Sequence, residues 1–381
     1  MRGLFYCHTH AAAAPLVRNL KICQNLVQDF DIDFIYGGPN IPISHDFPRF
    51  KFLQLPIIPL KRLENFLLDF DEDNPVVQEM LHRRKLAMES FISGKYDFFF
   101  TELFPFAKYE CKNEILSLID RLKRENPKCL MLCSCRDVLD LFSFQNSTAI
   151  TEWILKYYDR IFVHSDPSII RLNDTFPAAN KIEEKIIYTG FVPNSNPESK
   201  APYQSPPNTI LVSIGGGGFG EPLLKGVAKA APLLPNYHFI FILGPRSPET
   251  YKTDIEAFKC SNMTVQPFLE NFEEALRHSV LSISLGGYSL IDVVKAKIPA
   301  IVYPMAYQDQ RWRASRFALL GLVKQISESE LEKPVVLASI ILKTIHTKLP
   351  DYSINFNGAE NTRIELRKVL GLPSGHPSPN T

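Results

Sequence analysis

Four consecutive glycines, Gly215 to Gly218, are the residues whose type and spacing point most directly to chemistry. They follow an apolar run over 209–212 that predicts a buried strand, and they precede a predicted helix with Pro222 in its first turn. Glycines let backbone N–H groups approach a phosphate, and a helix N-terminus favours negative charge. The pattern therefore predicts a cradle for a phosphate-bearing ligand such as a nucleotide derivative. The alternative is a tight turn that binds no ligand.

The same arrangement recurs where a glycine pair separates a predicted strand over 281–284 from a predicted helix over 288–297. Backbone N–H groups in such a loop can bind a second phosphate. The residues predicted to form this second loop are Gly286, Gly287, Tyr288 and Ser289.

Three polar residues follow these loops at positions suited to sugar hydroxyl groups. Asp292 falls one turn into the helix after Gly287, so it either accepts hydrogen bonds from ribose hydroxyls or complements the charge of the helix N-terminus. Asp309 and Gln310 follow a predicted strand over 300–303 and open the next helix. A carboxylate beside an amide suits recognition of a sugar, and the alternative is a helix cap.

Polar side chains also follow the predicted strands of the first half of the chain. Because the carboxyl ends of parallel strands meet at one edge of a sheet, these residues are candidates for a second site. A single histidine after a strand is more often a capping or core residue, but repeated placement favours a site. The candidates are His8, His10, Glu102, Arg136 and Asp137.

Strand-like and helix-like segments alternate along the chain, which predicts α/β domains with mostly parallel sheets covered by helices. The segment 194–208 is rich in Pro, Ser and Asn and predicts a linker. We expect domains over 1–193 and 209–357, a last helix over 358–370 and a frayed tail over 371–381. The expected strands are 4–7, 33–36, 50–55, 96–101, 129–133, 160–164, 185–188, 210–214, 238–243, 264–266, 281–284 and 300–303.

The composition is that of a globular protein, with 45% hydrophobic and 22% charged residues among 381. A net charge of +1 argues against nucleic acid as the main partner, because proteins that bind it usually carry a basic excess. The seven cysteines are an odd number, mostly in apolar runs, so we expect reduced thiols in a cytoplasmic protein. No apolar run approaches the roughly 20 residues of a membrane span. Cys133 and Cys135 lack a second cysteine pair, so no zinc site is expected.

Short stretches in a fixed order form a recognisable pattern over most of the chain, and it resembles that of GT-B glycosyltransferases. The second half is similar to the C-terminal domain of glycosyltransferase family 28, typified by the peptidoglycan N-acetylglucosamine transferase. The chain looks closer still to a bacterial branch of predicted glycosyltransferases. The stretches are 36–39, 101–106, 136–140, 163–167, 188–193, 215–218, 286–288, 309–314 and 358–362.

The resemblance implies the GT-B fold, an α/β fold of two Rossmann-like domains whose mostly parallel sheets face each other across a cleft. It implies that the C-terminal domain binds a nucleotide-sugar donor, a UDP-sugar above all, with both glycine loops at the phosphates. Asp292 would contact the ribose, and Asp309 and Gln310 the donor sugar. The last helix would cross back onto the N-terminal domain.

The same resemblance implies an acceptor, either lipid-linked or a small molecule, bound by the N-terminal domain near Glu102, Arg136 and Asp137. No cofactor or metal is implied, because backbone N–H groups and helix dipoles can stabilise the leaving diphosphate. This chain departs from the family in its first loop after a strand. The family has Gly-x-Gly-His there, whereas Ala11 to Ala14 and Pro15 stand here. The candidates to replace the lost histidine as general base are His8, His10 and Asp137.

Two other functions stay open on this pattern. A nucleotide-sugar hydrolase shares the architecture and uses water as acceptor, and a non-catalytic GT-B partner subunit would explain the alanine-rich loop. The segment 52–63 mixes apolar and basic residues. It predicts either peripheral contact with the inner face of a membrane or an acceptor-side loop that packs on the core.

Overall fold

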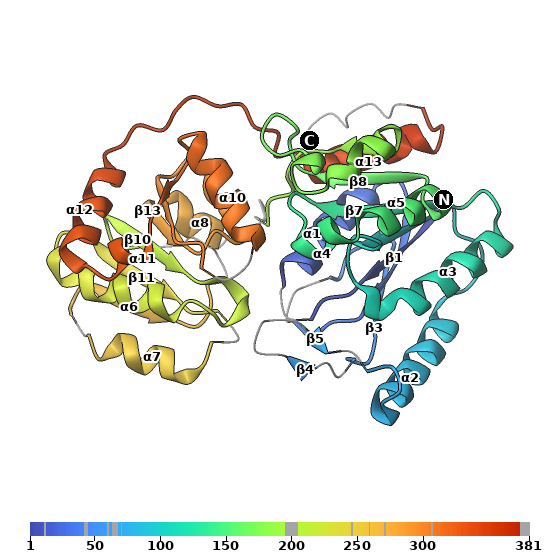
Figure 1. Ribbon diagram of the computed structural model, residues 1–381, viewed down its shortest axis with the longest axis horizontal. Coiled ribbons are helices and arrows are strands. Elements are labelled where there is room, and N and C mark those ends of the chain that lie inside the picture. The colour runs from blue at the N-terminus through green and yellow to red at the C-terminus, as the bar shows by residue number, and fades with distance from the viewer. Residues whose placement is uncertain are drawn as a thin grey trace. The chain divides into compact units, whose positions relative to one another are not determined.

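The computed structural model forms two compact units, and the first unit is built from both ends of the chain. One unit consists of Met1–Val192 with Asn355–Thr381, and the other consists of Pro193–Ile354. In each unit, helices cover a central sheet (Figure 1). Most of the predicted linker and most of the predicted tail lie outside the described residues. The structure describes residues 1–10, 13–41, 45–58, 61–62, 68–69, 71–194, 205–244, 247–258, 260–269, 272–305 and 308–373.

The first unit has a parallel sheet whose strand order reverses beside β1 (Arg2–Cys7). This strand pairs with β2 (Asp31–Tyr36) on one side and with β6 (Phe98–Glu102) on the other. Such a reversal is a switch point, where loops leave the carboxyl ends of neighbouring strands in opposite directions. The outer strands are β3 (Phe50–Gln54) beyond β2, and β7 (Leu130–Arg136), β8 (Arg160–His164) and β9 (Ile186–Tyr188) beyond β6.

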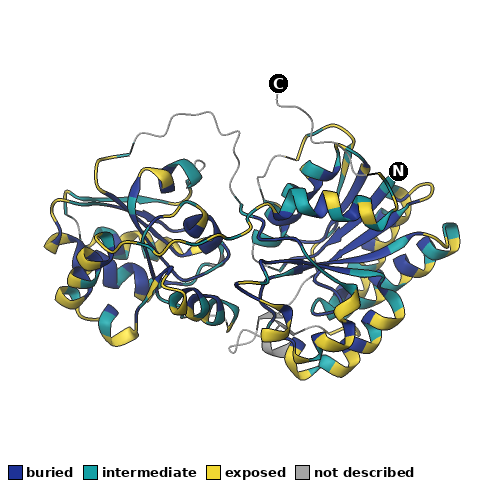
Figure 2. Ribbon diagram, turned by 90° about the horizontal axis from the view of Figure 1, so that it is seen from above, coloured by how far each residue is buried: buried dark blue, intermediate teal, exposed yellow. Residues whose placement is uncertain are grey.

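Aromatic side chains fill one face of this sheet. The rings of Phe5 and Phe100 stack with centroids 4.7 Å apart, and Phe34 continues the row at 5.9 Å from Phe5. The inner strands are buried along their length because helices cover both faces (Figure 2). The helices are α1 (Ala14–Leu26) and α13 (Gly358–Val369) over the aromatic face, and α2 (Pro75–Phe91), α3 (Lys112–Glu125), α4 (Leu141–Gln145) and α5 (Ser147–Tyr157) elsewhere, with 3-10 turns η1 (Tyr109–Cys111), η2 (Leu172–Asp174) and η3 (Pro177–Lys185).

The second unit repeats the same strand order. Its β10 (Thr209–Ser213) lies between β11 (His238–Ile242) and β13 (Ser279–Ser284), and all pairs in this sheet are parallel. The outer strands are β12 (Met263–Gln266), β14 (Ala300–Val302) and β15 (Lys324–Gln325). Its helices are α6 (Glu221–Ala230), α7 (Glu249–Glu256), α8 (Phe272–Arg277), α9 (Leu290–Lys295), α10 (Gln308–Leu319), α11 (Glu328–Leu331) and α12 (Pro334–Ile345), with η4 (Gly215–Gly217) and η5 (Ala231–Leu233).

The α/β fold class and the parallel sheets are confirmed, and the differences are local. The helix predicted over 288–297 is shorter, because α9 begins only at Leu290 and Lys297 adopts a left-handed φ of 56°. The edge strand β15 is polar and only two residues long, so it has no hydrophobic pattern to find. The strands β4 (Lys61–Arg62) and β5 (Leu68–Asp69) form an antiparallel pair. Strand β4 and part of β3 fall in the predicted membrane-contact segment 52–63, of which residues 59, 60 and 63 lie outside the described residues.

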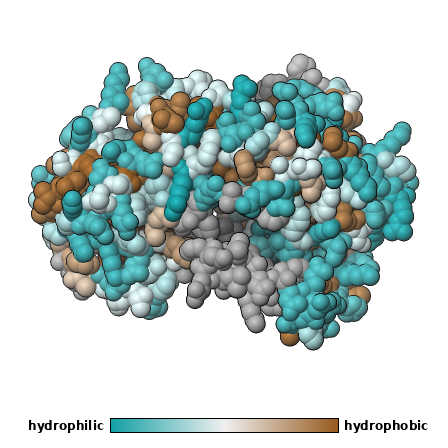
Figure 3. Space-filling view, viewed as in Figure 1, coloured by the Kyte–Doolittle hydropathy of each residue, from teal (hydrophilic) through white to brown (hydrophobic). Residues whose placement is uncertain are grey.

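The surface of the described residues is mostly hydrophilic in the view of Figure 3, with small scattered hydrophobic patches of the kind that any globular protein carries. None of the helices among the described residues has the length and apolar character needed to cross a lipid bilayer.

The last helix, α13, returns to the first unit and packs along α1. Leu366 is fully buried in the aromatic core, and Asn361 Nδ2 donates to Thr189 O at 2.7 Å. Asp29, which follows α1, joins the two helices through ion pairs to Arg363 at 2.7 Å and Arg367 at 2.6 Å. The end of the chain therefore completes the first unit.

Asp29→Asn tests this docking. We expect a loss of about 1 kcal/mol at neutral pH, because both arginines lose a charged acceptor. Partial burial acts to raise the pKa of Asp29, but the two arginines outweigh it, and the pKa lies below the ordinary value of 3.8. A depressed carboxyl pKa contributes stability above that ordinary value, and the contribution disappears as falling pH protonates the folded state.

The difference from wild type should therefore be full at pH 7 and shrink below about pH 3.8. Urea unfolding of the full chain at several pH values is the measurement, with Asp46→Asn on the exposed surface as control. A difference that persists unchanged at acid pH would contradict the ion-pair account.

Candidate active site

The two predicted glycine loops leave neighbouring strands at the same edge of the second sheet. Strands β10 and β13 pair in parallel, with Ser213 opposite Ser284, and each loop begins within two residues of that pair. The strand order reverses between these strands, because β11 lies on the other side of β10. Ligands of Rossmann-like sheets bind beyond the carboxyl ends of the strands at such a reversal.

The first loop presents open backbone. Among the described residues, no atom outside the adjacent chain would lie within 4 Å of a Cβ placed on Gly215 or Gly216, so these residues leave this side of the loop uncovered. Gly215 and Gly218 both have a φ of 71°, a backbone conformation that residues other than glycine rarely adopt. Gly220 occupies the N-cap of α6. Because glycine has no side chain, it cannot accept a hydrogen bond from the first N–H groups of this helix.

The second loop is packed on one side and open on the other. A Cβ on Gly286 would lie 2.8 Å from Val302 Cγ1, so this residue must be glycine for the loop to sit against β14. Among the described residues, a Cβ on Gly287 would meet only Gln310 Nε2, at 3.9 Å. Gln310 Oε1 is buried and has no hydrogen-bond partner among the described residues. Gln310 therefore offers an unused acceptor beside an accessible part of the loop.

Arg313 links this loop to α10. Its Nη1 donates to Gly286 O at 3.1 Å, and its Nη2 lies 3.7 Å from Asp309 Oδ2. The guanidinium also lies over the ring of Tyr288, 5.8 Å from the centroid, and the residue is 1% exposed. We did not predict this residue for the site. The available signal was its spacing, since Asp309 and Arg313 are one helical turn apart.

Asp292 lies inside the second unit. It is 4% exposed, and its Oδ2 accepts a hydrogen bond from Asn194 Nδ2 at 3.1 Å. Ser289 precedes α9 in a helical conformation and makes no side-chain cap. The contact of Asp292 with a ribose stays a prediction. The carboxylate that would make this contact already accepts the hydrogen bond from Asn194.

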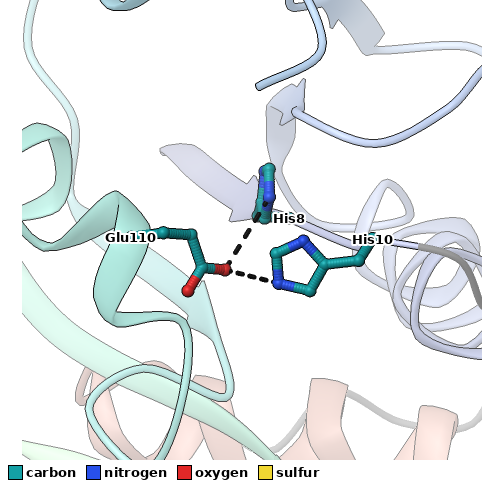
Figure 4. A group of neighbouring side chains, drawn as sticks. All are labelled: His8, His10 and Glu110. Atoms are coloured by element: carbon teal, nitrogen blue, oxygen red, sulfur yellow. Dashed lines mark ion pairs between the residues drawn. The ribbon is translucent and has the colours of Figure 1, made fainter. Parts of the chain in front are cut away.

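In the first unit, His8 and His10 follow β1 directly and meet Glu110 from η1 (Figure 4). His10 Nε2 lies 2.7 Å from Glu110 Oε1, and His8 Nε2 lies 3.8 Å from the same oxygen. His8 is 2% exposed, whereas the His10 side chain is 19% exposed. Glu110 was missed by sequence reasoning, since it lies about a hundred residues from the histidines in the sequence.

Burial governs the protonation of this group. It is the main reason that the pKa of His8 lies well below the ordinary histidine value, and the charges of Lys108 and Arg84 add to it. Burial also lowers the pKa of His10, although the hydrogen bond to Glu110 opposes this. Burial alone would raise the pKa of Glu110, but His10 and Lys108 together bring it below the ordinary value. Neutral imidazoles beside an ionised carboxylate are the result.

The remaining predicted residues of the first unit lie deeper. Glu102 is 3% exposed and accepts hydrogen bonds from Arg18, from Asn19 Nδ2 at 2.6 Å and from Ser134 Oγ at 3.2 Å. It ties α1 to β6 and β7. Asp137 is fully buried after β7, and Arg136 is only partly exposed. Their roles toward an acceptor stay predictions.

The loop in which this chain departs from the family is only partly described. Ala11 and Ala12 lie outside the described residues. Ala13 occupies the N-cap of α1 with no side-chain hydrogen bond, and Pro15 sits in the first turn. His10 is therefore the last described side chain before this gap.

Residues 209–362 match the sequence model of the glycosyltransferase family 28 C-terminal domain. The predicted resemblance is confirmed for the second unit, which carries both glycine loops. An uncharacterized glycosyltransferase of Methanosarcina acetivorans is 26% identical over 229 residues. This match covers 58% of the present chain and 55% of that protein, so it spans about half the length of the relative.

Solved structures show that the chain has the GT-B fold, with two Rossmann-like units. Staphylococcus aureus MnaA in a co-structure with UDP aligns with a TM-score of 0.62 at 9% identity, covering 100% of both chains. MurG of Acinetobacter baumannii aligns with a TM-score of 0.53 at 15% identity, covering 97% of this chain and 98% of that one. At these identities the likeness concerns the fold.

Arg313→Met tests the packing of the second glycine loop. It removes the donor to Gly286 O and leaves buried polar groups unpaired, so we expect the unfolding free energy to fall by about 1–3 kcal/mol. Arg313→Lys should cost less, because it keeps the charge but loses the planar fork.

Urea unfolding of the full chain measures both effects. Arg277→Met is the matched control, because Arg277 also ends in ion pairs but its side chain is 54% exposed. If Arg313→Met were no more destabilising than Arg277→Met, the described role of Arg313 would be wrong.

Proposed function

We propose that this protein transfers a sugar from a UDP-sugar donor to the hydroxyl group of an acceptor. The observation that carries the proposal is the pair of glycine loops at the switch point of the second sheet, with backbone at Gly215, Gly216 and Gly287 that the described residues leave uncovered. The family 28 C-terminal domain over 209–362 and the UDP bound to the similar fold of MnaA support it.

The donor residues have distinct roles in this proposal. The backbone N–H groups of Gly215 to Gly218 and the N-terminus of α6 stabilise the negative charge that develops on the leaving diphosphate. The Gly286–Gly287 loop adds further N–H groups. Gln310 Oε1, which has no partner among the described residues, accepts a hydrogen bond from a hydroxyl group of the donor sugar. Asp309 lies beside it on the first turn of α10.

His10 is the proposed general base, and Glu110 orients it. In this proposal the proton of His10 sits on Nε2, which lies 2.7 Å from Glu110 Oε1, so the Nδ1 lone pair can accept the proton of the acceptor hydroxyl. The acceptor oxygen then forms its bond to the anomeric carbon as the bond to the diphosphate oxygen breaks. His10 fits this role better than Asp137, which is fully buried, or His8, which is 2% exposed.

Gly216→Val tests the donor site. No described residue outside the adjacent chain fills the space beside Gly216, and its φ is not left-handed, so the protein should fold normally. The added side chain blocks the approach of the diphosphate to the backbone N–H groups. Hydrogen bonds from these groups to charged phosphate oxygens contribute more to affinity than hydrogen bonds between neutral groups. We expect the Kd for UDP to rise about 10–100-fold, measured by isothermal titration calorimetry.

Ala257→Val, on an exposed position after α7, adds the same kind of bulk to the same unit and serves as control. Two results would sink the donor proposal: no binding of UDP to the folded wild type, or equal affinity in wild type and Gly216→Val.

His10→Gln tests the general base. Loss of a positioned base typically lowers kcat by about 10²–10⁴-fold, and UDP affinity should stay unchanged because the donor loops are untouched. Glu110→Gln should lower kcat less, because the amide keeps a hydrogen-bonding oxygen. His278→Gln is the matched control, since His278 also pairs with a glutamate, at 3.0 Å from Glu274, but its side chain is 52% exposed.

Incubation with the UDP-sugar alone separates this function from its alternatives. Release of free sugar at the rate seen with acceptors would indicate a hydrolase, and intact UDP binding without turnover by any acceptor would indicate a non-catalytic subunit. Residence in the cytoplasm stays a prediction. Peripheral contact with the inner membrane face also stays a prediction, and liposome flotation of the full chain tests it.

A further inference from the structure

His8 has no role in the chemistry proposed above, yet it is buried in an unusual way. Both ring nitrogens are shielded from solvent and neither has a hydrogen-bond partner among the described residues. Buried polar atoms without a partner are rare in folded proteins and call for an explanation, such as an ion that the site binds. Figure 4 shows the ring of His8 beside His10 and Glu110.

The three side chains form a set of metal ligands. One ligand atom from each of His8, His10 and Glu110 lies within 4.8 Å of the other two. Ligand atoms around a tetrahedral zinc ion, each about 2 Å from the metal, lie roughly 3.3 Å apart. The separations from Glu110 Oε1 are 2.7 Å to His10 Nε2 and 3.8 Å to His8 Nε2, on either side of that value. Small side-chain movements would therefore complete the site.

Two imidazoles and a carboxylate favour a borderline transition metal such as Zn²⁺ over Mg²⁺ or Ca²⁺, which prefer oxygen ligands. We propose that His8, His10 and Glu110 bind a divalent transition-metal ion of the zinc type, with a fourth position left for water. The backbone supports this arrangement, because both histidines come from the segment that follows β1. Gly37 makes room for the His8 ring, since a Cβ atom at position 37 would lie only 2.6 Å from His8 Nδ1.

Binding of the ion changes the tautomer of His10. In the mechanism proposed above, the metal-free His10 carries its proton on Nε2, facing Glu110, and its lone pair on Nδ1. An ion held by Nε2 leaves the neutral ring with its proton on Nδ1, so the nitrogen that would accept the acceptor's proton is no longer available. The ion therefore inhibits transfer. This consequence rests on the proposed function, whereas binding of the ion does not.

Nearby positive charge sets how tightly the ion binds. Arg84 is one of the positive charges near the site, but its guanidinium is already paired with Glu114, at 2.7 Å and 2.9 Å, and also donates to Tyr6. Lys108 lies at the start of η1, the turn that carries Glu110, and its charge acts on all three proposed ligands. Lys108→Met should thus strengthen metal binding, whereas loss of any ligand should weaken it.

The experiment uses the full-length protein after treatment with a chelator. We expect one Zn²⁺ per chain by titration calorimetry, and Co²⁺ should give the intense visible absorption of a four-coordinate site. His8→Gln and Glu110→Gln should each reduce Zn²⁺ affinity by more than the about 10–100-fold that changes to outer-shell partners cause. Lys108→Met should raise the affinity, and the control His278→Gln should leave it unchanged.

UDP binding and circular dichroism of every variant show whether it is folded. Absence of the cobalt spectrum and of zinc binding in the wild type would overturn the proposal. So would zinc binding of equal affinity in wild type, His8→Gln and Glu110→Gln, since the ion would then sit elsewhere, for example on a cysteine. Metal binding with the expected ligand dependence supports the site even if no transfer is found. If transfer is found, Zn²⁺ should inhibit His8→Gln less than wild type, each relative to its own uninhibited rate.

Discussion

Parallel pairing of β10 with β13 is the interaction on which the candidate donor site depends. Their hydrogen bonds bring two loops that are about seventy residues apart in sequence to the same sheet edge, with Ser213 opposite Ser284. The first unit uses the same device, because β1 pairs with both β2 and β6 and delivers His8 and His10 to its own switch point. Each unit therefore has its candidate functional residues where the strand order reverses. In the second unit, the glycines also keep the backbone accessible at this point.

Buried arginines stabilise the surroundings of these edges. Arg18 holds Glu102 beneath the end of β6, Arg84 is paired with Glu114 close to His8, and Arg313 fixes Gly286 against α10. All three are almost fully shielded from water, and each has a carboxylate or carbonyl partner, as a buried charge requires. A planar guanidinium suits this work because it can donate in several directions at once. The three buried guanidinium charges beside these edges are therefore each paired.

The sequence was sufficient for the apolar strands of the two main sheets, for their parallel pairing and for both glycine loops, because these depend on local apolar runs and on glycine itself. It was insufficient for contacts between distant segments. Glu110 reaches His10 across a hundred residues, and Glu102 is neutralised by Arg18 on another element. A charged residue after a strand reads as a ligand when its partner is not visible in the sequence. Burial of Asp292 and Asp137 was missed for the same reason.

The most direct test of the account is a crystal structure of the full chain with UDP bound. We predict diphosphate oxygens within hydrogen-bonding distance, about 2.7–3.2 Å, of backbone nitrogen atoms in Gly215 to Gly218, with the leaving oxygen on the side of Gln310. UDP bound away from β10 and β13, or held only by side chains with these nitrogen atoms facing solvent, would contradict it.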